Sequence, residues 1–387
     1  MAWVSLAKLL IFVAGLVYLT VPHLTRPSHR PLAHLWTPNA VLAILAAFAL
    51  SLLWSGAEPE FALSALVKHG KLLEIVLLMV LIRTPWEARM GITVFVAGQV
   101  LVLLGSWLLA IGVPMPWSSH ASSPYVLFSE SYLDQSIMFA TIAAVLWHLR
   151  SDGFCPRWLA AVLAGGALLN VFFLLQGRTG YAIAVIMLSL AAMWQMPRRL
   201  RLATLVLTPL VVLSALYLGS AQVQERLTKV IDESQTYLQT AESKTSLGWR
   251  LNAWHRSLQA MQEKPVAGHG VGSWTPVIKH YESDAGSRIF GVGNASNPHQ
   301  EYLLWGVELG TGGILLLLLL LACVARDAQG FPPPVQRASM SMLVAMAVAC
   351  LFNSALYDDL MGDFFCIGLG LLMALGTTGH SNSKAAA

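Results

Sequence analysis

Charged residues are scarce in this chain. Asp, Glu, Lys and Arg make up 11% of the 387 residues, whereas hydrophobic residues make up 56%. Soluble domains are roughly a quarter charged, so the composition excludes an ordinary soluble domain. Ten-residue segments of alternating polarity, which are typical of a transmembrane β-barrel, are also absent. The sequence therefore predicts an all-α membrane protein.

Cysteines are few as well, and they are scattered. The chain has 4 of them, Cys155, Cys323, Cys350 and Cys366, mostly inside apolar runs. Their spacing predicts neither a disulfide framework nor a zinc site. The acidic residues show no metal-ligand spacing either, so we expect no bound metal and no cofactor.

Long apolar runs dominate what is present. Each is about long enough to cross ~30 Å of hydrocarbon as a helix, and they lie at roughly 2–21, 38–56, 65–83, 90–112, 131–149, 158–176, 180–196, 200–219, 299–325, 338–355 and 360–376. The first run is followed by no small-residue cleavage site, so we interpret it as a retained helix. We expect about eleven or twelve transmembrane helices.

Basic residues in the short loops set the orientation, because cytoplasmic loops carry an excess of Lys and Arg. One set of loops holds Arg26, Arg30, Arg83, Arg89, Arg150, Arg157, Arg198, Arg199, Arg201, Arg326, Arg337 and the tail's Lys384. The opposite loops, 57–64, 113–130, 177–179 and 356–359, hold a single basic residue, Arg178. The first set is therefore predicted to be cytoplasmic, and the opposite set to lie outside.

One extramembrane segment is long. It divides the chain into transmembrane helices at 1–219, an outer loop at 220–297, and further transmembrane helices with a short cytoplasmic tail at 298–387. Basic and acidic residues nearly balance in the loop, so we expect no nucleic-acid partner. Apolar spacing predicts helices at 221–240 and 246–265. The glycine-rich stretch 268–274 has no preceding strand, so we interpret it as a flexible turn rather than a dinucleotide site.

His299 lies at the seam between this loop and the next apolar run. Asn297-Pro298-His299-Gln300 has the form of a helix start, with Asn297 as the cap and His299 in the first turn. The positive end of a helix disfavours imidazolium, so His299 is expected to stay neutral near pH 7. A neutral imidazole is suited to act as a general base, although a histidine at this position is more often a surface or capping residue.

Two arginines suit an anionic substrate. Arg178 starts a helix after a tight outer turn, with Thr179 as the expected cap, so a guanidinium group and a helix N-terminus point outward together. Arg250 lies on the edge of the apolar face of 246–265. The alternatives are a lipid headgroup contact for Arg178 and a solvated helix edge for Arg250. With His299, the two arginines would hold a pyrophosphate leaving group beside an activated hydroxyl.

Supporting residues are weaker candidates. Asp358, in the last outer turn, either orients His299 or an arginine or belongs to a solvated acidic turn. Lys68, near the outer end of the third run, either lines the cavity or extends to the membrane surface, since polar groups in a span are costly and often functional.

The sequence resembles the O-antigen ligase and polymerase superfamily of bacterial membrane enzymes. The resemblance rests on the many-span layout, the large outer loop before the last helices, and three motifs: GRTG around Arg178, WRLNAWHRSLQAMQEKPVAGHGVGSW, and NPHQEYLLWGVELGTGGILL. The family commonly has Asn after its essential histidine, whereas this chain has Gln300.

The resemblance implies a metal-independent glycosyltransferase with a GT-C-like helical fold in the bacterial inner membrane, its active site facing the periplasm. The implied donor is a glycan on undecaprenyl pyrophosphate, and for ligases the acceptor is a sugar hydroxyl of the lipid A–core oligosaccharide. It further implies that His299 is the base of an inverting reaction and that Arg178 and Arg250 bind the donor pyrophosphate.

Several other functions stay open at this stage. A polymerase of lipid-linked repeat units and a protein O-oligosaccharyltransferase would use similar residues. A transporter of lipid-linked glycans would pair charges along a midplane pathway, and no inverted pair of broken helices is visible. A non-catalytic membrane scaffold would make His299, Arg178 and Arg250 individually dispensable.

Overall fold

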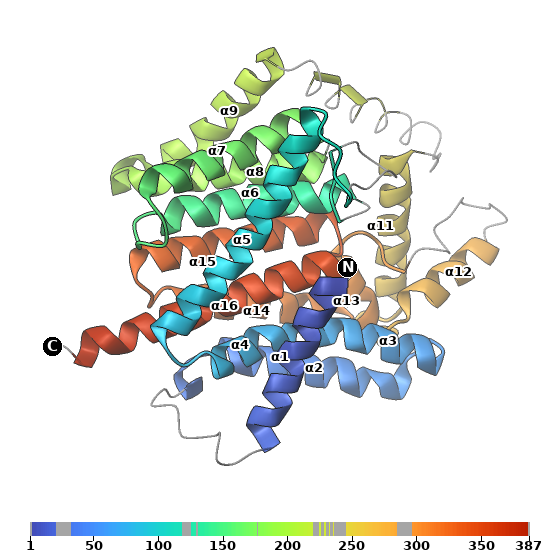
Figure 1. Cartoon of the computed structure of the whole chain (residues 1–387). Helices are drawn as coiled ribbons and strands as arrows, with labels where there is room; N and C mark the ends of the chain where they lie inside the picture. Colours follow the sequence, from blue (N-terminus) through green and yellow to red (C-terminus); the bar gives the residue numbers. More distant parts are fainter. Residues whose placement is uncertain are drawn as a thin grey trace.

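The computed structural model describes residues 2–20, 32–117, 125–128, 131–175, 177–219, 245–284 and 296–385, together with isolated positions 224, 225, 228, 229, 232 and 235. The helix expected at 221–240 therefore lies almost wholly outside the described residues. The described chain folds into helices that pack side by side as a bundle (Figure 1), and this confirms an all-α polytopic membrane protein.

Among the described residues, the part of the chain up to Gly219 gives nine α-helices and four short 3-10 turns. In chain order they are α1 (Ala2–Thr20), η1 (Leu32–His34), α2 (Thr37–Ser51), η2 (Leu52–Trp54), α3 (Pro59–His69), η3 (Gly70–Leu72), α4 (Leu73–Leu81), α5 (Pro85–Ala110), α6 (Tyr132–Leu149), α7 (Arg157–Phe173), α8 (Arg178–Gln195), η4 (Arg198–Leu200) and α9 (Arg201–Gly219).

The second half supplies the outer-loop helices and the last membrane helices. They are α11 (Ser246–Glu263), α12 (Trp274–Asp284), α13 (Glu301–Leu309), α14 (Thr311–Ala328), α15 (Pro333–Phe352) and α16 (Asp359–Ala385). In the described residues, 6 helices are long and apolar enough to cross a membrane, and the segments Lys8–Tyr18 and Arg157–Phe173 are shorter apolar helices.

Two of the predicted spans are broken. The run at 65–83 is divided by η3, so that α3 ends at His69 and α4 begins at Leu73. The run at 299–325 is divided at Gly310, which has φ +66° and separates α13 from α14. A Cβ on Gly310 would lie 2.6 Å from the carbonyl oxygens of Pro265 and Val266. The leucine-rich run therefore contains a sharp corner where the outer loop packs against it.

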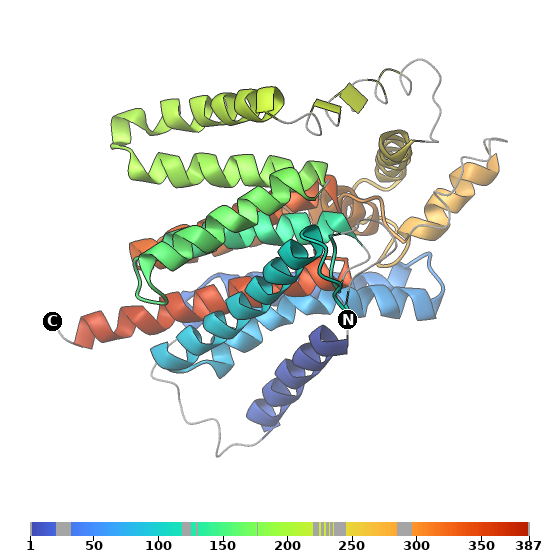
Figure 2. The ribbon, with the colours of Figure 1, turned by 45° about the horizontal axis from the view of Figure 1, so that its top comes forward.

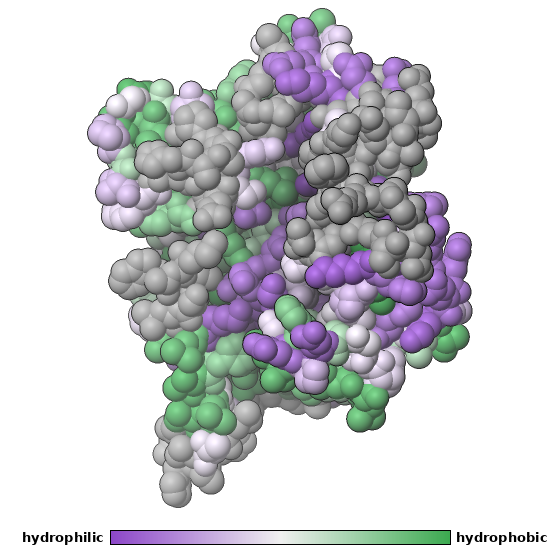
Figure 3. All heavy atoms as spheres, turned by 90° about the vertical axis from the view of Figure 1, so that its right-hand side faces the viewer, coloured by the Kyte–Doolittle hydropathy of each residue, from purple (hydrophilic) through white to green (hydrophobic). Residues whose placement is uncertain are grey.

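The centre of the bundle is formed by α4, α6, α8, α15 and α16, while α9 has no buried residue and lies at the edge. α11 and α12 lie together at one end of the bundle, beside α13 and α3 (Figures 1 and 2). Figure 3 looks onto that end, where hydrophilic residues gather. The outer-loop helices therefore sit over the polar end of the bundle.

The glycine-rich stretch 268–274 is a packed loop and not the flexible turn that its composition predicts. Its backbone bonds to α13, with His269 N–H donating to Val307 O at 2.8 Å and Gly270 N–H donating to Glu308 O at 2.9 Å. Gly270 has φ +89°, and a Cβ there would lie 2.3 Å from Ser55 Cα. Glycine is required because only a residue without a side chain allows this approach in the left-handed region.

Candidate active site

His299 lies just before α13 rather than in its first turn. Its φ of +51° is left-handed, so the helix cannot include it, and α13 begins at Glu301 with Gln300 as the N-cap. Gln300 Oε1 accepts from Leu303 N–H at 2.9 Å. Asn297 accepts from His299 N–H at 2.9 Å and so closes a turn instead of capping the helix. The predicted helix start was wrong by three residues, and Gln300 has the capping role.

The imidazole of His299 has a defined partner. Its Nδ1 lies 2.8 Å from Asn353 Oδ1, and its ring meets that of Trp249 edge-on with centroids 5.1 Å apart. An amide oxygen can only accept, so Nδ1 carries the proton and Nε2 keeps its lone pair. Burial lowers the pKa of His299, the Asn353 bond raises it, and the charge of Arg250 lowers it. The expected neutral state follows from burial and a nearby cation rather than from a helix N-terminus.

Arg250 reaches the site from α11. Thr245 caps this helix by accepting from Gly248 N–H at 3.0 Å, which confirms the helix predicted at 246–265. One turn after Arg250, Trp254 donates from Nε1 to Pro298 O at 3.1 Å and ties α11 to the residue before His299. Burial lowers the pKa of Arg250, Tyr132 raises it, and the charge of Arg178 lowers it.

Arg178 is the first residue of α8. Gly177 is the N-cap, and no side chain caps the helix, so Thr179, which is buried, does not have the role expected for it. A Cβ on Gly177 or Gly180 would lie 2.2 or 2.3 Å from Ser136 Oγ. The start of α8 is therefore pressed against α6, near Tyr132, because both glycines lack a side chain. This contact brings Arg178 to the part of the bundle that Arg250 overlies.

Electrostatic influence links the three predicted site residues in the order Arg178, Arg250, His299. The charge of Arg178 acts on Arg250, and the charge of Arg250 acts on His299. Two cations beside a neutral imidazole repel one another unless an anion lies between or beside them. Guanidinium groups bind phosphate oxygens through paired N–H donors. Chemically, the arrangement can hold a diphosphate and accept a proton from a hydroxyl group.

The two supporting residues lie elsewhere. The hydrogen-bond partner of His299 is Asn353, so Asp358 is not the residue that orients this ring. Burial raises the pKa of Asp358 to about 6, against the charges of Lys71 and Lys68. Lys68 Nζ lies 4.4 Å from the centroid of the Tyr357 ring. Asp358 is therefore part of the α15–α16 loop, which begins at Asn353, and Lys68 packs against that loop at Tyr357.

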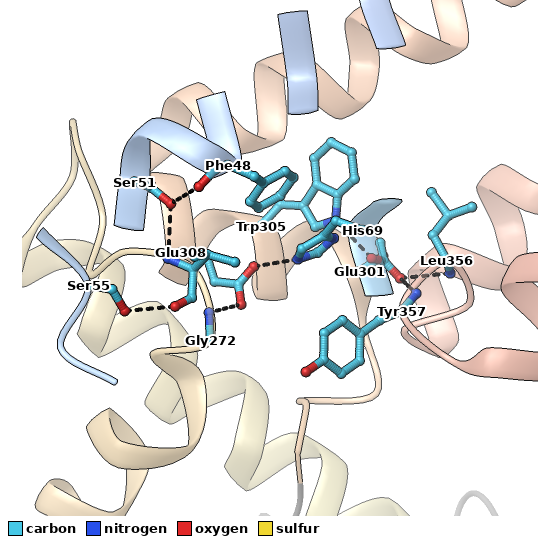
Figure 4. Close-up of polar contacts among 11 residues, drawn as sticks. Phe48, Ser51, Ser55, His69, Gly272, Glu301, Trp305, Glu308, Leu356 and Tyr357 are labelled. Carbon is cyan, nitrogen blue, oxygen red and sulfur yellow. Dashed lines mark hydrogen bonds and ion pairs between the residues drawn. The ribbon is translucent and has the colours of Figure 1, made fainter. Parts of the chain in front are cut away.

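Two fully buried glutamates of α13 hold the site in place (Figure 4). Glu301 Oε1 accepts from Trp305 Nε1 at 2.8 Å, and Oε2 accepts from the backbone N–H groups of Leu356 and Tyr357 at 2.9 and 3.2 Å. These bonds fix the α15–α16 loop against α13. Since His299 precedes α13 and Asn353 begins that loop, Glu301 sets the distance between them.

The second glutamate, Glu308, joins three segments. Its Oε2 lies 2.8 Å from His69 Nε2, and its Oε1 accepts from Gly272 N–H at 2.7 Å (Figure 4). The His69 ring stacks on Phe48 with centroids 3.8 Å apart. Sequence reasoning missed both glutamates, and it interpreted Asn353 as a hydrogen-bond partner between helices rather than as part of the site. The available signal was EYLLWGVEL, in which two carboxylates stand within an apolar helix and must find partners.

Among the described residues, no group of three or more His, Cys, Asp or Glu side chains is arranged to hold a metal ion. The cysteines in those same parts of the chain are free thiols.

Comparison with known proteins gives two findings. Residues 159–318 match the family model described as O-antigen ligase, and this range contains Arg178, Arg250 and His299. A protein of Haemophilus influenzae, described only as an uncharacterized protein, is 26% identical over 99 residues, which cover 26% of this chain. The match spans 25% of that relative's length.

Proposed function

Because residues 159–318 match the O-antigen ligase family model, we propose that this chain is an O-antigen ligase. In this proposal it transfers a polysaccharide from undecaprenyl pyrophosphate to a sugar hydroxyl of the lipid A–core oligosaccharide. The reaction takes place at the periplasmic face of the bacterial inner membrane. The observation that carries the proposal is that Arg250 of α11 lies close enough to feel the charge of Arg178 and to act on His299.

The acceptor hydroxyl is activated by His299. Nδ1–H donates to Asn353, so Nε2 is the atom that takes the proton. The acceptor oxygen then bonds to the anomeric carbon as the bond from that carbon to the phosphate oxygen breaks. Both electrons of the broken bond leave with undecaprenyl pyrophosphate. The attack comes from the side opposite the leaving group, so the anomeric centre is inverted.

In the proposed reaction, arginine side chains stabilise the negative charge on the leaving group. As the glycosidic bond breaks, negative charge grows on the pyrophosphate, and Arg178 and Arg250 are placed to stabilise it through hydrogen bonds from their guanidinium groups. Fixed donors aimed at developing charge are usually the largest single contribution to catalysis. No metal ion or cofactor enters this scheme.

The structural division supports separate tasks for the three parts of the chain. In the proposal, the helices of residues 1–219 and 298–387 form the membrane bundle that receives the lipid-linked donor, and α11 and α12 of the outer loop 220–297 cover the periplasmic mouth. Asp358 and Lys68 support the loop that carries Asn353 rather than the reacting groups.

The test is lipopolysaccharide gel banding in a host that lacks its own ligase. The wild-type chain should restore high-molecular-weight bands, whereas His299→Ala should leave core-only bands at normal membrane levels. Reconstitution with purified lipid-linked donor and core acceptor then separates two reactions. A ligase gives one transfer for each acceptor, whereas lengthening of the lipid-linked chain would identify a polymerase.

A further inference from the structure

The opposite end of α6 carries a basic pocket that the transfer reaction does not use. A cavity of about 50 Å³ is lined by Arg150, Arg337, His148 and Ser151, beside Trp194 of α8. α6 has 18 residues, and at 1.5 Å per residue it is about 27 Å long. The pocket therefore lies about one membrane thickness from Tyr132, which adjoins Arg250. The loop basic residues predict that this end faces the cytoplasm.

Positive charge in this pocket has no acidic counterpart among the lining residues. Burial lowers the pKa of Arg150, and the guanidinium groups of Arg157 and Arg337 lower it further. Arg150 donates to Trp147 O, and its guanidinium carbon lies 3.6 Å from the centroid of the Trp147 ring. The indole thus holds Arg150 in a fixed position, which leaves its other N–H groups to a ligand.

The imidazole of His148 adds a buried nitrogen without a partner to the pocket. His148 is 6% exposed, and its Nε2 has no hydrogen-bond partner among the described residues. The ring packs edge-on against Trp194, with centroids 4.9 Å apart. A buried nitrogen without a partner is costly, so a group that hydrogen-bonds to it would be favoured there. An anion that accepts hydrogen bonds from His148 Nε2–H, Arg150 and Arg337 would give each of these three side chains a partner.

An apolar groove continues from the basic pocket into the bundle. It has a volume of about 270 Å³ and lies between α6, α7 and α8. Trp147, Ala191 and Gln195 line both the groove and the pocket. The rest of the groove is formed mainly by small and apolar residues, including Gly165, where a Cβ would meet no atom within 4 Å. A ligand that fits both spaces has an anionic head and an apolar tail.

We propose that this site binds an anionic glycerophospholipid of the cytoplasmic leaflet. Its phosphate accepts hydrogen bonds from Arg150, Arg337 and His148, and one acyl chain lies in the groove between α6, α7 and α8. Basic pockets between transmembrane helices on the cytoplasmic side are known to take such headgroups. The site is independent of the transfer reaction, and the bound lipid seals the junction of α6 with α8 and α15.

The test is native mass spectrometry of the purified full-length protein in detergent. Phosphatidylglycerol, phosphatidylcholine with the same acyl chains, and inorganic phosphate are added separately. Wild type should retain phosphatidylglycerol over phosphatidylcholine. Arg150→Gln/Arg337→Gln should weaken phosphatidylglycerol binding by at least about tenfold, since each charge-assisted bond contributes the energy of roughly a tenfold change. Gly165→Leu, which fills the groove, should weaken lipid binding because it displaces the acyl chain, while the headgroup pocket is unchanged.

Matched controls separate the site from general effects. Arg83→Gln removes another basic residue of the predicted cytoplasmic loops, and Gly98→Leu adds a side chain at an exposed glycine of α5 with no atom within 4 Å. Both should bind as wild type does. Equal retention of both lipids, unchanged binding by the double variant, or phosphate binding that matches lipid binding and ignores Gly165→Leu would each overturn the proposal.

Discussion

Asn353 Oδ1 and His299 Nδ1 lie 2.8 Å apart and join the α15–α16 loop to the residues before α13. Because an amide oxygen accepts and never donates, this contact selects one tautomer of the imidazole. Nε2 is left as the basic atom. Asn353 is therefore a positioning residue in the proposed reaction, with the role that a carboxylate has in a Ser-His-Asp triad.

Asn353→Asp should shift the acid limb of the pH–activity profile to higher pH. The pKa of His299 is lowered in the wild type, so the neutral base is present at pH values above that pKa and is lost as pH falls through it. A carboxylate beside the ring favours imidazolium and so raises the pKa of His299. We therefore expect the midpoint of the acid limb to shift to higher pH by about one unit. The measurement is kcat/KM against pH with reconstituted donor and acceptor.

Two comparisons make that result specific. Asn353→Ala should lower kcat by about five- to tenfold, since a net hydrogen bond contributes about 1 kcal/mol. Asn39→Asp, at an exposed position on α2, should leave the profile unchanged. A profile for Asn353→Asp that overlays the wild type would show that this contact does not tune the base.

Arg178→Lys and Arg250→Lys should each lose transfer activity by about 10²–10³-fold, which is the range seen when one donor to a developing anion is removed. Lysine keeps the charge but lacks the planar fork that binds two phosphate oxygens. The assay is single-turnover transfer with the reconstituted protein. Arg256→Lys serves as the control, because Arg256 lies on α11 and donates to Gln259 at 3.0 Å. Near-wild-type rates for Arg178→Lys and Arg250→Lys would show that the paired N–H donors of the guanidinium groups are not needed for transfer.

Glu308→Ala should destabilise the fold by about 2–5 kcal/mol, because it leaves two buried hydrogen-bonding groups without an acceptor at about 1–3 kcal/mol each. It would leave His69 and the Gly272 N–H without their acceptor. Thermal unfolding in detergent measures the change. Glu58→Ala, at an exposed position before α3 where no side-chain cap exists, provides the reference. Equal melting temperatures for the two variants would contradict a structural role for Glu308.

Chelation of divalent metal should leave transfer intact, since two guanidinium groups meet the pyrophosphate charge in the proposed reaction. Activity of the reconstituted protein is measured with and without EDTA at fixed ionic strength. A rate lost on chelation and restored by magnesium would mean that arginine alone does not stabilise the leaving group.

Hydropathy located most of the helices because each must expose apolar residues to lipid or bury them in the bundle. It failed at Gly310 and at η3, where apolar residues continue across a break in the backbone. The conformation of Gly310 depends on Pro265 and Val266, which are distant in sequence. The packing of the loop at 268–274 likewise depends on Ser55 and Glu308, so local composition indicated a flexible turn.

The three candidate site residues could be singled out in the sequence because each breaks a local pattern. Arg178 lies in an otherwise uncharged outer turn, Arg250 on an amphipathic helix, and His299 at a membrane seam. Their grouping is a property of tertiary packing. Asn353 was not assigned to the site, because nothing in its own segment indicates that His299 is the partner. The sequence predicted a neutral His299 from the positive end of a helix, whereas burial and the charge of Arg250 are what lower its pKa.

The most direct measurement is a cryo-EM structure of the full chain with a non-transferable lipid diphosphate sugar bound. The account predicts that phosphate oxygens lie within hydrogen-bond distance of both Arg178 and Arg250, with the anomeric carbon facing the space next to His299 Nε2. A diphosphate bound away from either guanidinium group, with His299 turned from the sugar, would contradict it.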